Sequence, residues 1–142
     1  MHATRDDKIN ALAEVPLFAG CGQHELVQLA KVLDTSWATS GEMLETQGQR
    51  TRWWKIIIFG TASVTRDGRP TGLIGAGDWW GERSIINRTP SSLSVVALTP
   101  VALLTMERRD FLKLPGRHPL VAARIMSELV DRRAPYEGLA IA

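Results

Sequence analysis

The sequence predicts a mainly β domain with flanking helices: an antiparallel β-roll of the jelly-roll type, with N-terminal helices and C-terminal closing helices. Apolar residues recur at helical spacing near both ends of the chain. Between residues 34 and 106, short apolar runs are separated every few residues by glycine, which is typical of a closed or rolled antiparallel sheet. Asp67-Gly68 separates two such runs and indicates a tight hairpin, because primed turns need positive φ.

The N-terminal helices are predicted within residues 6–33. A short apolar stripe that contains Ile9 and Leu12 ends at Pro16, and a Gly20-Cys21-Gly22 turn follows. The next stripe places four apolar residues on one helical face: Leu26, Leu29, Ala30 and Leu33.

The β-roll is predicted over residues 34–106. Its expected strands cover residues 35–39, 42–47, 53–59, 61–66, 71–75, 93–98 and 101–106. In the run 53–59, alternation separates two faces, one with Trp54, Ile56 and Ile58 and the other with Trp53, Lys55, Ile57 and Phe59. Because both faces are largely apolar, we expect one to meet the interior of the roll and the other to meet the helices.

The closing helices are predicted over residues 108–132. The first is expected to stop near Pro115-Gly116, and Pro119 suits the first turn of the next. In that helix Val121, Ile125 and Leu129 recur every four residues, with Met126 and Val130 beside them. This spacing favours a helix docked on the core, and a lid or a dimer helix is the alternative. Residues 1–133 are then one domain, and residues 134–142 are a tail.

The composition is that of an ordinary soluble globular protein, with 44% hydrophobic and 23% charged residues in a chain of 142. No stretch approaches the roughly 20 apolar residues that cross a bilayer, so we expect no membrane segment. The first ten residues are too polar for a signal peptide, and the single cysteine, Cys21, fits a reducing compartment. A cytoplasmic location is therefore expected.

Several functional classes are disfavoured. Lysine and arginine are interleaved with acids at a net charge of +2, which does not suit a nucleic-acid surface. His2, His24 and His118 lie far apart and none falls in an expected strand, so no metal centre is predicted. The sequence also lacks a nucleophile elbow and a P-loop. We interpret the chain as a non-enzyme without a cofactor.

Two tryptophan doublets, Trp53-Trp54 and Trp79-Trp80, are unusual. Neighbours on a strand point to opposite faces, so both members of a doublet cannot face the same interior. Trp79 and one of Trp53 or Trp54 are candidates for an exposed contact surface. A ring covered by a helix is the alternative.

Five features occur here in a particular order: VPLFAGCGQHELVQLA, the turns at Gly41 and Gly48, IIIFGTASV, GAGDWWGE, and VVALTPVALLTMERRDFLKL. Their order and spacing, over roughly residues 9–132, resemble the cyclic-nucleotide-binding domain. That family includes the regulatory subunit of protein kinase A, the catabolite activator protein and the cyclic-nucleotide-gated channels. The resemblance implies a β-roll that binds a cyclic nucleotide and regulates an attached or associated effector.

The Gly-Glu loop is the family's phosphate-binding cassette. The resemblance implies that Gly81 brings its backbone N–H close to the ligand, which needs the absence of a Cβ. It implies that Glu82 accepts a hydrogen bond from the ribose 2′-hydroxyl. Residues 83–87, which include Arg83 and Ser84, are expected to form a short helix whose first amides face the cyclic phosphate.

The sequence departs from the family nine residues after Glu82. There the family has an arginine that pairs with the exocyclic phosphate oxygens, in the sequence Pro-Arg-Ala-Ala-Thr. This chain has Pro90-Ser91-Ser92-Leu93-Ser94, so that Ser91 takes the position of the arginine. Leu93 replaces a small residue near the ligand, and its bulk is expected to intrude on the pocket.

Three residues are candidates to compensate for the missing arginine. Arg88 precedes Ser91 in the loop and is able to swing inwards, while Arg83 follows Glu82 directly. Solvated surface arginines are the alternative for both. Ser92 matches a position at which some relatives place a hydroxyl group that touches the ligand, so it is a candidate donor to a phosphate oxygen.

The leading hypothesis is a cyclic-nucleotide-binding regulatory module with cyclic AMP as its ligand, cyclic GMP remaining open, and with affinity weakened by Ser91. The alternative is a ligand-free domain that uses its tryptophan surface to form a homodimer or to dock on an effector domain. DNA binding is not expected, because no helix-turn-helix follows the closing helices as it does in the family's transcription factors.

Overall fold

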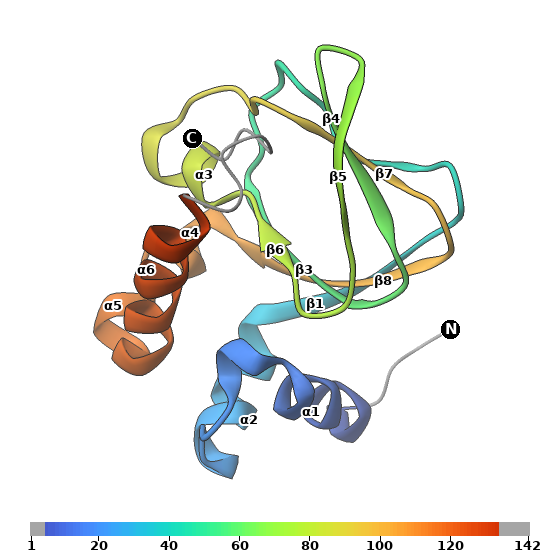
Figure 1. Cartoon of the computed structure of the whole chain (residues 1–142). Coiled ribbons are helices and arrows are strands. Elements are labelled where there is room, and N and C mark those ends of the chain that lie inside the picture. Colours follow the sequence, from blue (N-terminus) through green and yellow to red (C-terminus); the bar gives the residue numbers. More distant parts are fainter. Residues whose placement is uncertain (1–4, 134–142) are drawn as a thin grey trace.

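The computed structural model describes residues 5–133 as two four-stranded antiparallel sheets rolled together, with helices packed on one side (Figure 1). The strands are β1 (Leu33–Ala38), β2 (Met43–Glu45), β3 (Trp53–Phe59), β4 (Ala62–Arg66), β5 (Arg69–Ile74), β6 (Trp79–Trp80), β7 (Ser94–Ala97) and β8 (Val101–Glu107). One sheet has the order β1-β8-β3-β6 and the other β2-β7-β4-β5. The predicted fold class, a mainly β roll with flanking helices, is confirmed.

The β4–β5 hairpin confirms the turn predicted at Asp67-Gly68. Both residues have positive φ, 54° and 79°, and the flanking pair Arg66 and Arg69 are opposite each other in the ladder. Positive φ at both central residues is the property of a type I′ turn, whose twist matches that of the strands.

β3 separates two cores, as the alternation in its sequence predicted. Trp54 and Ile56 are fully buried among helix residues, and Ile58 packs at the edge of the same cluster. Ile57 points the other way, into the interior of the roll. Both ends of the second face depart from this pattern, since Trp53 and Phe59 are 39% and 54% exposed.

β6 is a strand that the sequence pattern did not predict, and it corrects the interpretation of its tryptophans. Trp79 is opposite Ile56 and belongs to the helix-side core, whereas Trp80 is opposite Lys55 and belongs to the interior of the roll. Both rings are buried, because each face of this strand is covered. The expectation of an exposed Trp79 is therefore wrong, and the alternative of a helix-covered ring is correct.

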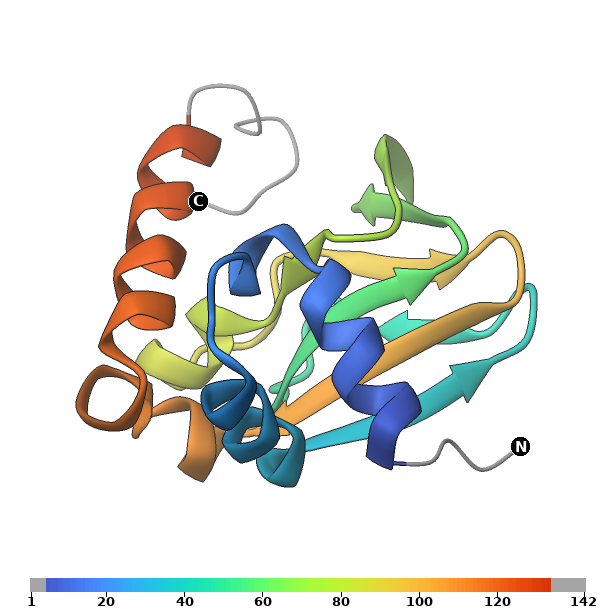
Figure 2. The same cartoon turned by 90° about the horizontal axis from the view of Figure 1, so that it is seen from below.

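The N-terminal helices cover the outer face of the first sheet (Figure 2). They are α1 (Arg5–Glu14), the short 3₁₀ helix η1 (Pro16–Phe18) and α2 (Gln23–Val32). Each helix contributes an almost completely buried side chain to the core between the helices and the sheet: Leu12, Phe18 and Leu29. Lys8 extends from α1 to the end of α2 and donates hydrogen bonds to the carbonyl oxygens of Ala30 and Leu33.

The remaining helices are α3 (Glu82–Asn87), α4 (Arg108–Phe111), α5 (Leu114–Arg117) and α6 (Pro119–Arg133). The prediction that a helix stops near Pro115 is wrong, because Pro115 lies in the first turn of α5. The first turn of a helix tolerates proline, since its N–H groups have no partner within the helix. α6 begins at Pro119, as predicted.

α6 docks through one face, and its contacts extend to the partly buried Leu129 and to Glu128, whose carboxylate accepts a hydrogen bond from Trp79 Nε1. Val121 and Ile125 are buried against the helix-side core, which confirms the docking face, but Met126 and Val130 are 60% and 70% exposed. Within residues 5–133, no helix combines the length and the apolar character that crossing a membrane requires. The predicted tail, residues 134–142, lies outside the described residues.

Candidate nucleotide-binding site

A cavity of about 240 Å³ opens between the β6–α3 segment and the loop that leads into β7. Its walls come from Glu45, from residues 80–84 and from residues 89–93. The cavity brings together most of the site residues that the sequence predicted: Gly81, Glu82, Arg83, Ser84, Ser91 and Ser92. Arg88 is not among the residues that line it.

Gly81 fixes the entry into α3. Its φ is 106°, a conformation that side chains rarely adopt, and its carbonyl oxygen accepts the first helical hydrogen bond from Ile85. A Cβ at this position would lie 2.8 Å from the carbonyl oxygen of Trp53. The backbone of β3 therefore requires a glycine here independently of any ligand.

α3 is held by contacts at both of its ends. Glu82 and Ser84, in its first turn, are buried. The Ser84 hydroxyl group donates to the Thr89 carbonyl oxygen at 2.6 Å and accepts the backbone N–H of Thr51 at 3.1 Å. At the other end, Arg108 Nε donates to the carbonyl oxygen of Ile85. These bonds give the Gly81–Ser84 wall a fixed geometry.

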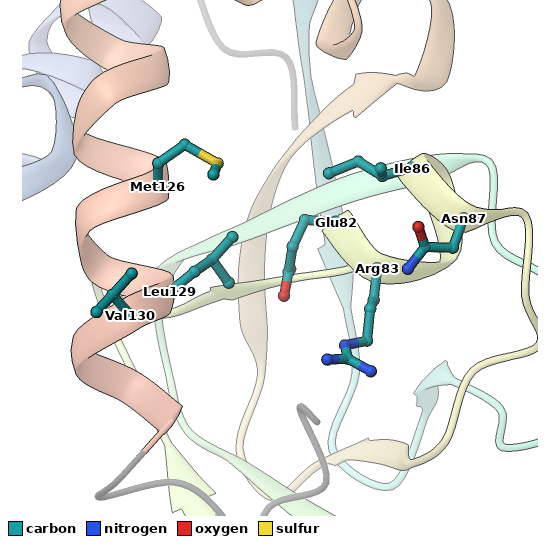
Figure 3. A pocket seen from close by; sticks show the side chains of 7 residues that line it. All are labelled: Glu82, Arg83, Ile86, Asn87, Met126, Leu129 and Val130. Atoms are coloured by element: carbon teal, nitrogen blue, oxygen red, sulfur yellow. The ribbon is translucent and has the colours of Figure 1, made fainter.

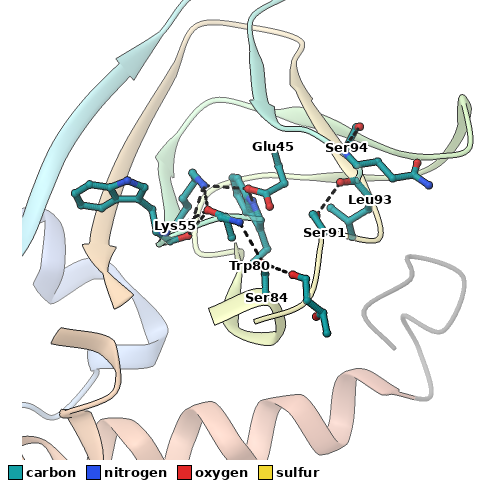
Figure 4. A network of polar contacts seen from close by, with 11 residues as sticks. Glu45, Lys55, Trp80, Ser84, Ser91, Leu93 and Ser94 are labelled. Carbon is teal, nitrogen blue, oxygen red and sulfur yellow. Dashed lines mark hydrogen bonds and ion pairs between the residues drawn. The ribbon is translucent and has the colours of Figure 1, made fainter. Parts of the chain in front are cut away.

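Ser91 lies in the opposite wall and is firmly held (Figure 4). Its backbone N–H donates to the Gln49 carbonyl oxygen and its own carbonyl oxygen accepts from Gly48 N, both at 2.8 Å. Its hydroxyl group donates to the Leu93 carbonyl oxygen at 2.9 Å. The proton of this hydroxyl is therefore engaged within its own turn, where the family has a positively charged side chain.

The two arginines that the sequence offered as substitutes lie in different places. Arg83 is exposed and contributes to the wall of the cavity. Arg88 is exposed and caps the C-terminus of α3 in a left-handed conformation, with φ at 55°. Ser92 is half-buried in the same wall as Ser91.

Leu93 lines the cavity from the interior of the roll. It is 8% exposed and packs in the interior of the roll, in the same cluster as Ile57 and Trp80. Its side chain thus lines the cavity and belongs to a hydrophobic core at the same time. The bulky leucine side chain that the sequence predicted near the ligand therefore does line the cavity.

A buried ion pair beside the cavity was not predicted. Lys55 Nζ lies 3.0 Å from Glu45 Oε1, and these two side chains are only 13% and 4% exposed (Figure 4). Trp80 Nε1 donates to the same carboxylate oxygen at 3.4 Å. One signal for the pair was present in the sequence: Lys55 shares a strand face with the buried Ile57, and a buried lysine needs an anionic partner.

A second hollow, of about 290 Å³, lies between α3 and α6 (Figure 3). Ile86, Met126 and Val130 give it an apolar lining, and all three side chains are about half exposed or more. Glu82 and Arg83 line both this groove and the cavity. The first turn of α3 is therefore shared between the candidate ligand site and the closing helix.

α6 is joined to the N-terminal helices by polar contacts at its start. His118 Nδ1 lies 3.1 Å from Glu25 Oε2, and this hydrogen bond lowers the pKa of Glu25 below its ordinary value. Arg124 donates to the carbonyl oxygens of Leu17 and Ala19. Burial, together with a hydrogen bond to Glu25, raises the pKa of Cys21 to about 11, which leaves it an unreactive thiol near neutral pH.

The rolled sheet, the glycine-led helix and the cavity between two loops define a small ligand-binding regulatory domain. The chain belongs to the cyclic nucleotide-binding domain family, because residues 37–118 match the sequence profile of that family. This match confirms the resemblance found in the sequence.

Individual relatives agree with the family. The chain is 30% identical over 122 residues to a cyclic nucleotide-gated potassium channel of Rhizobium etli, a match that covers 86% of this chain and 34% of the channel. The catabolite activator protein of Thermus thermophilus has a similar structure, with a TM-score of 0.77 and 28% identity over 86% of this chain and 60% of that one.

A third relative is the regulatory subunit of a cAMP-independent protein kinase A from Trypanosoma cruzi, solved bound to guanosine. Its TM-score is 0.72 and its identity 30%, over 84% of this chain and 44% of that one. The chain thus spans less than half the length of the channel and of this kinase subunit.

Proposed function

We propose that this chain is a regulatory module that binds a cyclic nucleotide, cyclic AMP in preference to cyclic GMP, and that its affinity is weakened on the phosphate side. The observation that carries the proposal is a cavity in which one wall keeps the family's Gly81-Glu82 turn and the other has Ser91 in place of the arginine. The ligand lies between these walls, with its ribose towards Glu82.

The loss of the arginine sets the size of the weakening. A hydrogen bond between charged groups contributes about 1.5–3 kcal/mol, so its absence lowers affinity by roughly 10- to 200-fold. The Ser91 hydroxyl group offers no equal replacement, since it donates to Leu93. Arg83 supplies the remaining positive charge in the wall, from an exposed position.

The output of the module passes through α6. Because Glu82 and Arg83 line both the cavity and the α3–α6 groove, a ligand that reorders the first turn of α3 changes the surface on which the C-terminal half of α6 rests. The ligand then shifts the population of docked and undocked α6. The chain has a regulatory rather than a catalytic role, and the effector is an attached domain or a separate protein.

A purine nucleoside is another candidate ligand class for this site. The Trypanosoma cruzi relative is described as cAMP-independent and was solved with guanosine. Ser91, at the position of the arginine, favours a nucleoside in this chain as well. A nucleoside has no phosphate, so its affinity does not depend on the missing positive charge. The ligand-free alternative is supported by Leu93, a bulky and almost fully buried side chain that lines the cavity.

Isothermal titration calorimetry of the 142-residue chain with cyclic AMP and cyclic GMP tests the proposal. We expect saturable binding with a dissociation constant well above that of family members that have the arginine. Absence of binding heat up to millimolar concentrations of both ligands contradicts the sensor function and supports the ligand-free alternative.

A further inference from the structure

We infer that Glu45 makes this cavity select an uncharged nucleoside over the corresponding cyclic nucleotide. The inference rests on the proposed function in one respect, namely that the cavity formed by residues 80–84 and 89–93 is the ligand site. It adds a specificity-determining residue on β2, outside the cassette, and it fixes the class of ligand that binds most tightly.

The first step is the state of the Glu45 carboxylate. Glu45 is 6% exposed and lines the cavity. Oε1 accepts both of the hydrogen bonds that residues 5–133 donate to this carboxylate, from Lys55 Nζ and from Trp80 Nε1, and Oε2 accepts neither. An occupant of the cavity that donates a hydrogen bond to Oε2 forms a charge-assisted bond, which is stronger than a bond between neutral groups.

The second step is the charge of the cavity walls. Glu45 and Glu82 are both buried acids in these walls. The ammonium group of Lys55 also donates to Thr51 Oγ1 at 3.1 Å, and Lys55 lines a separate polar hollow but does not line the cavity. Of the lysines and arginines in the described part of the chain, Arg83 alone lines the cavity, and it is exposed. An entering phosphate therefore meets two buried carboxylates in the described walls, one of them paired with Lys55, and no buried cation lines the cavity.

The third step is the chemistry of the two ligands. The phosphate of a cyclic nucleotide carries a negative charge and offers only acceptor oxygens, so it cannot satisfy a carboxylate. A nucleoside has free 3′- and 5′-hydroxyl groups in place of the cyclic ester, and each is a donor as well as an acceptor. The nucleoside keeps the 2′-hydroxyl group for Glu82. It therefore offers a donor to each acid, whereas the phosphate of the cyclic nucleotide offers none to Glu45.

Calorimetric titration of the full chain with guanosine, adenosine, cyclic GMP and cyclic AMP provides the test. We expect each nucleoside to bind at least about tenfold more tightly than its cyclic monophosphate, which is the lower end of the effect of a hydrogen bond to a charged group. Equal binding, or tighter binding of the cyclic nucleotides, overturns the inference and leaves the proposed function standing. Absence of binding by all four ligands overturns both.

A double variant, Glu45→Leu with Lys55→Met, assigns the preference to Glu45. Removing the pair together avoids leaving a buried ammonium group without its partner. We expect the nucleoside affinity to fall about tenfold and the preference over the cyclic nucleotide to disappear. Glu42→Gln, a change at an exposed glutamate three residues earlier, is the matched control and should keep the wild-type preference. A double variant that keeps the preference overturns the role of Glu45.

Discussion

The two walls of the cavity are determined by different kinds of interaction. The Gly81–Ser84 wall is held mainly by its backbone: a positive φ, the close approach of Trp53, and the Ser84 hydroxyl group, which donates to one backbone group and accepts from another. The opposite wall owes its chemistry to individual side chains, namely Ser91, Leu93 and Glu45. The comparison teaches that a scaffold is able to keep the shape of a site while a few side chains change the charge that the site accepts.

The strongest test of this contrast removes one member of the buried ion pair. Glu45→Ala leaves the Lys55 ammonium group, which is 13% exposed, without its carboxylate. We expect the free energy of unfolding to fall by about 3–5 kcal/mol, measured by urea denaturation. The variant Glu45→Leu with Lys55→Met should lie much closer to the wild type. Equal losses in the single and double variants would show that the pair contributes by packing and not by charge.

Ser91→Arg restores the family's positive charge to the wall that contains Ser91. We expect cyclic AMP to bind roughly 10- to 200-fold more tightly, an effect of about 1.5–3 kcal/mol, as measured by calorimetry. Ser91→Gln is the matched control, since it adds length without charge and should leave the affinity near that of the wild type. An unchanged affinity in Ser91→Arg would contradict the charge explanation, and adding Leu93→Ala would then test whether bulk blocks the site.

Gly81→Ala tests the backbone-determined wall. The positive φ and the contact with the Trp53 carbonyl oxygen should together cost about 1–3 kcal/mol of stability, measured by thermal or urea denaturation. Gly41→Ala is the control, because Gly41 also has a positive φ, 89°, but its Cβ would meet nothing within 4 Å. If the two variants lose the same stability, conformational strain alone explains the loss and the approach of β3 adds nothing.

The smallest expected effect is a dependence of stability on pH, far from the cavity. The hydrogen bond from His118 lowers the pKa of Glu25 in the folded state. The Glu25 carboxylate therefore stabilises the folded state fully at pH values above its pKa in the unfolded chain, near 4.3. This stabilisation is lost as the pH falls through the lower pKa that Glu25 has in the folded state. Unfolding measured between pH 3 and 7 should show a shallower acid limb in Glu25→Gln than in the wild type. Glu14→Gln, at an exposed residue, should leave the limb unchanged.

Local sequence patterns were sufficient for much of the fold. The Asp67-Gly68 turn needs two positive φ angles, and few other residue pairs supply them, so the hairpin was predictable. The two faces of β3 were predictable because alternation within one strand is a local property. β6 was missed because two residues are too short to show any period, and the burial of Trp79 depends on helices distant in sequence.

The candidate site also has parts that the sequence predicted and parts that it did not. The Gly81–Ser84 wall and the Ser91 wall were predictable because the family motif specifies them residue by residue. The Glu45–Lys55 pair joins residues ten positions apart on β2 and β3, strands of different sheets. No local period links them, so only the three-dimensional structure brings Glu45 into the cavity wall.

The Trp79-Trp80 dipeptide has a practical consequence for measurement. The Trp80 indole lines the cavity and bonds to Glu45, while the adjacent Trp79 Nε1 donates to Glu128 Oε2 on α6 at 2.8 Å. Indole fluorescence responds to the polarity and hydrogen bonding around the ring. We therefore expect the emission of Trp80 to respond when a ligand enters the cavity and that of Trp79 to respond when α6 undocks, with Trp37, Trp53 and Trp54 contributing the rest of the signal.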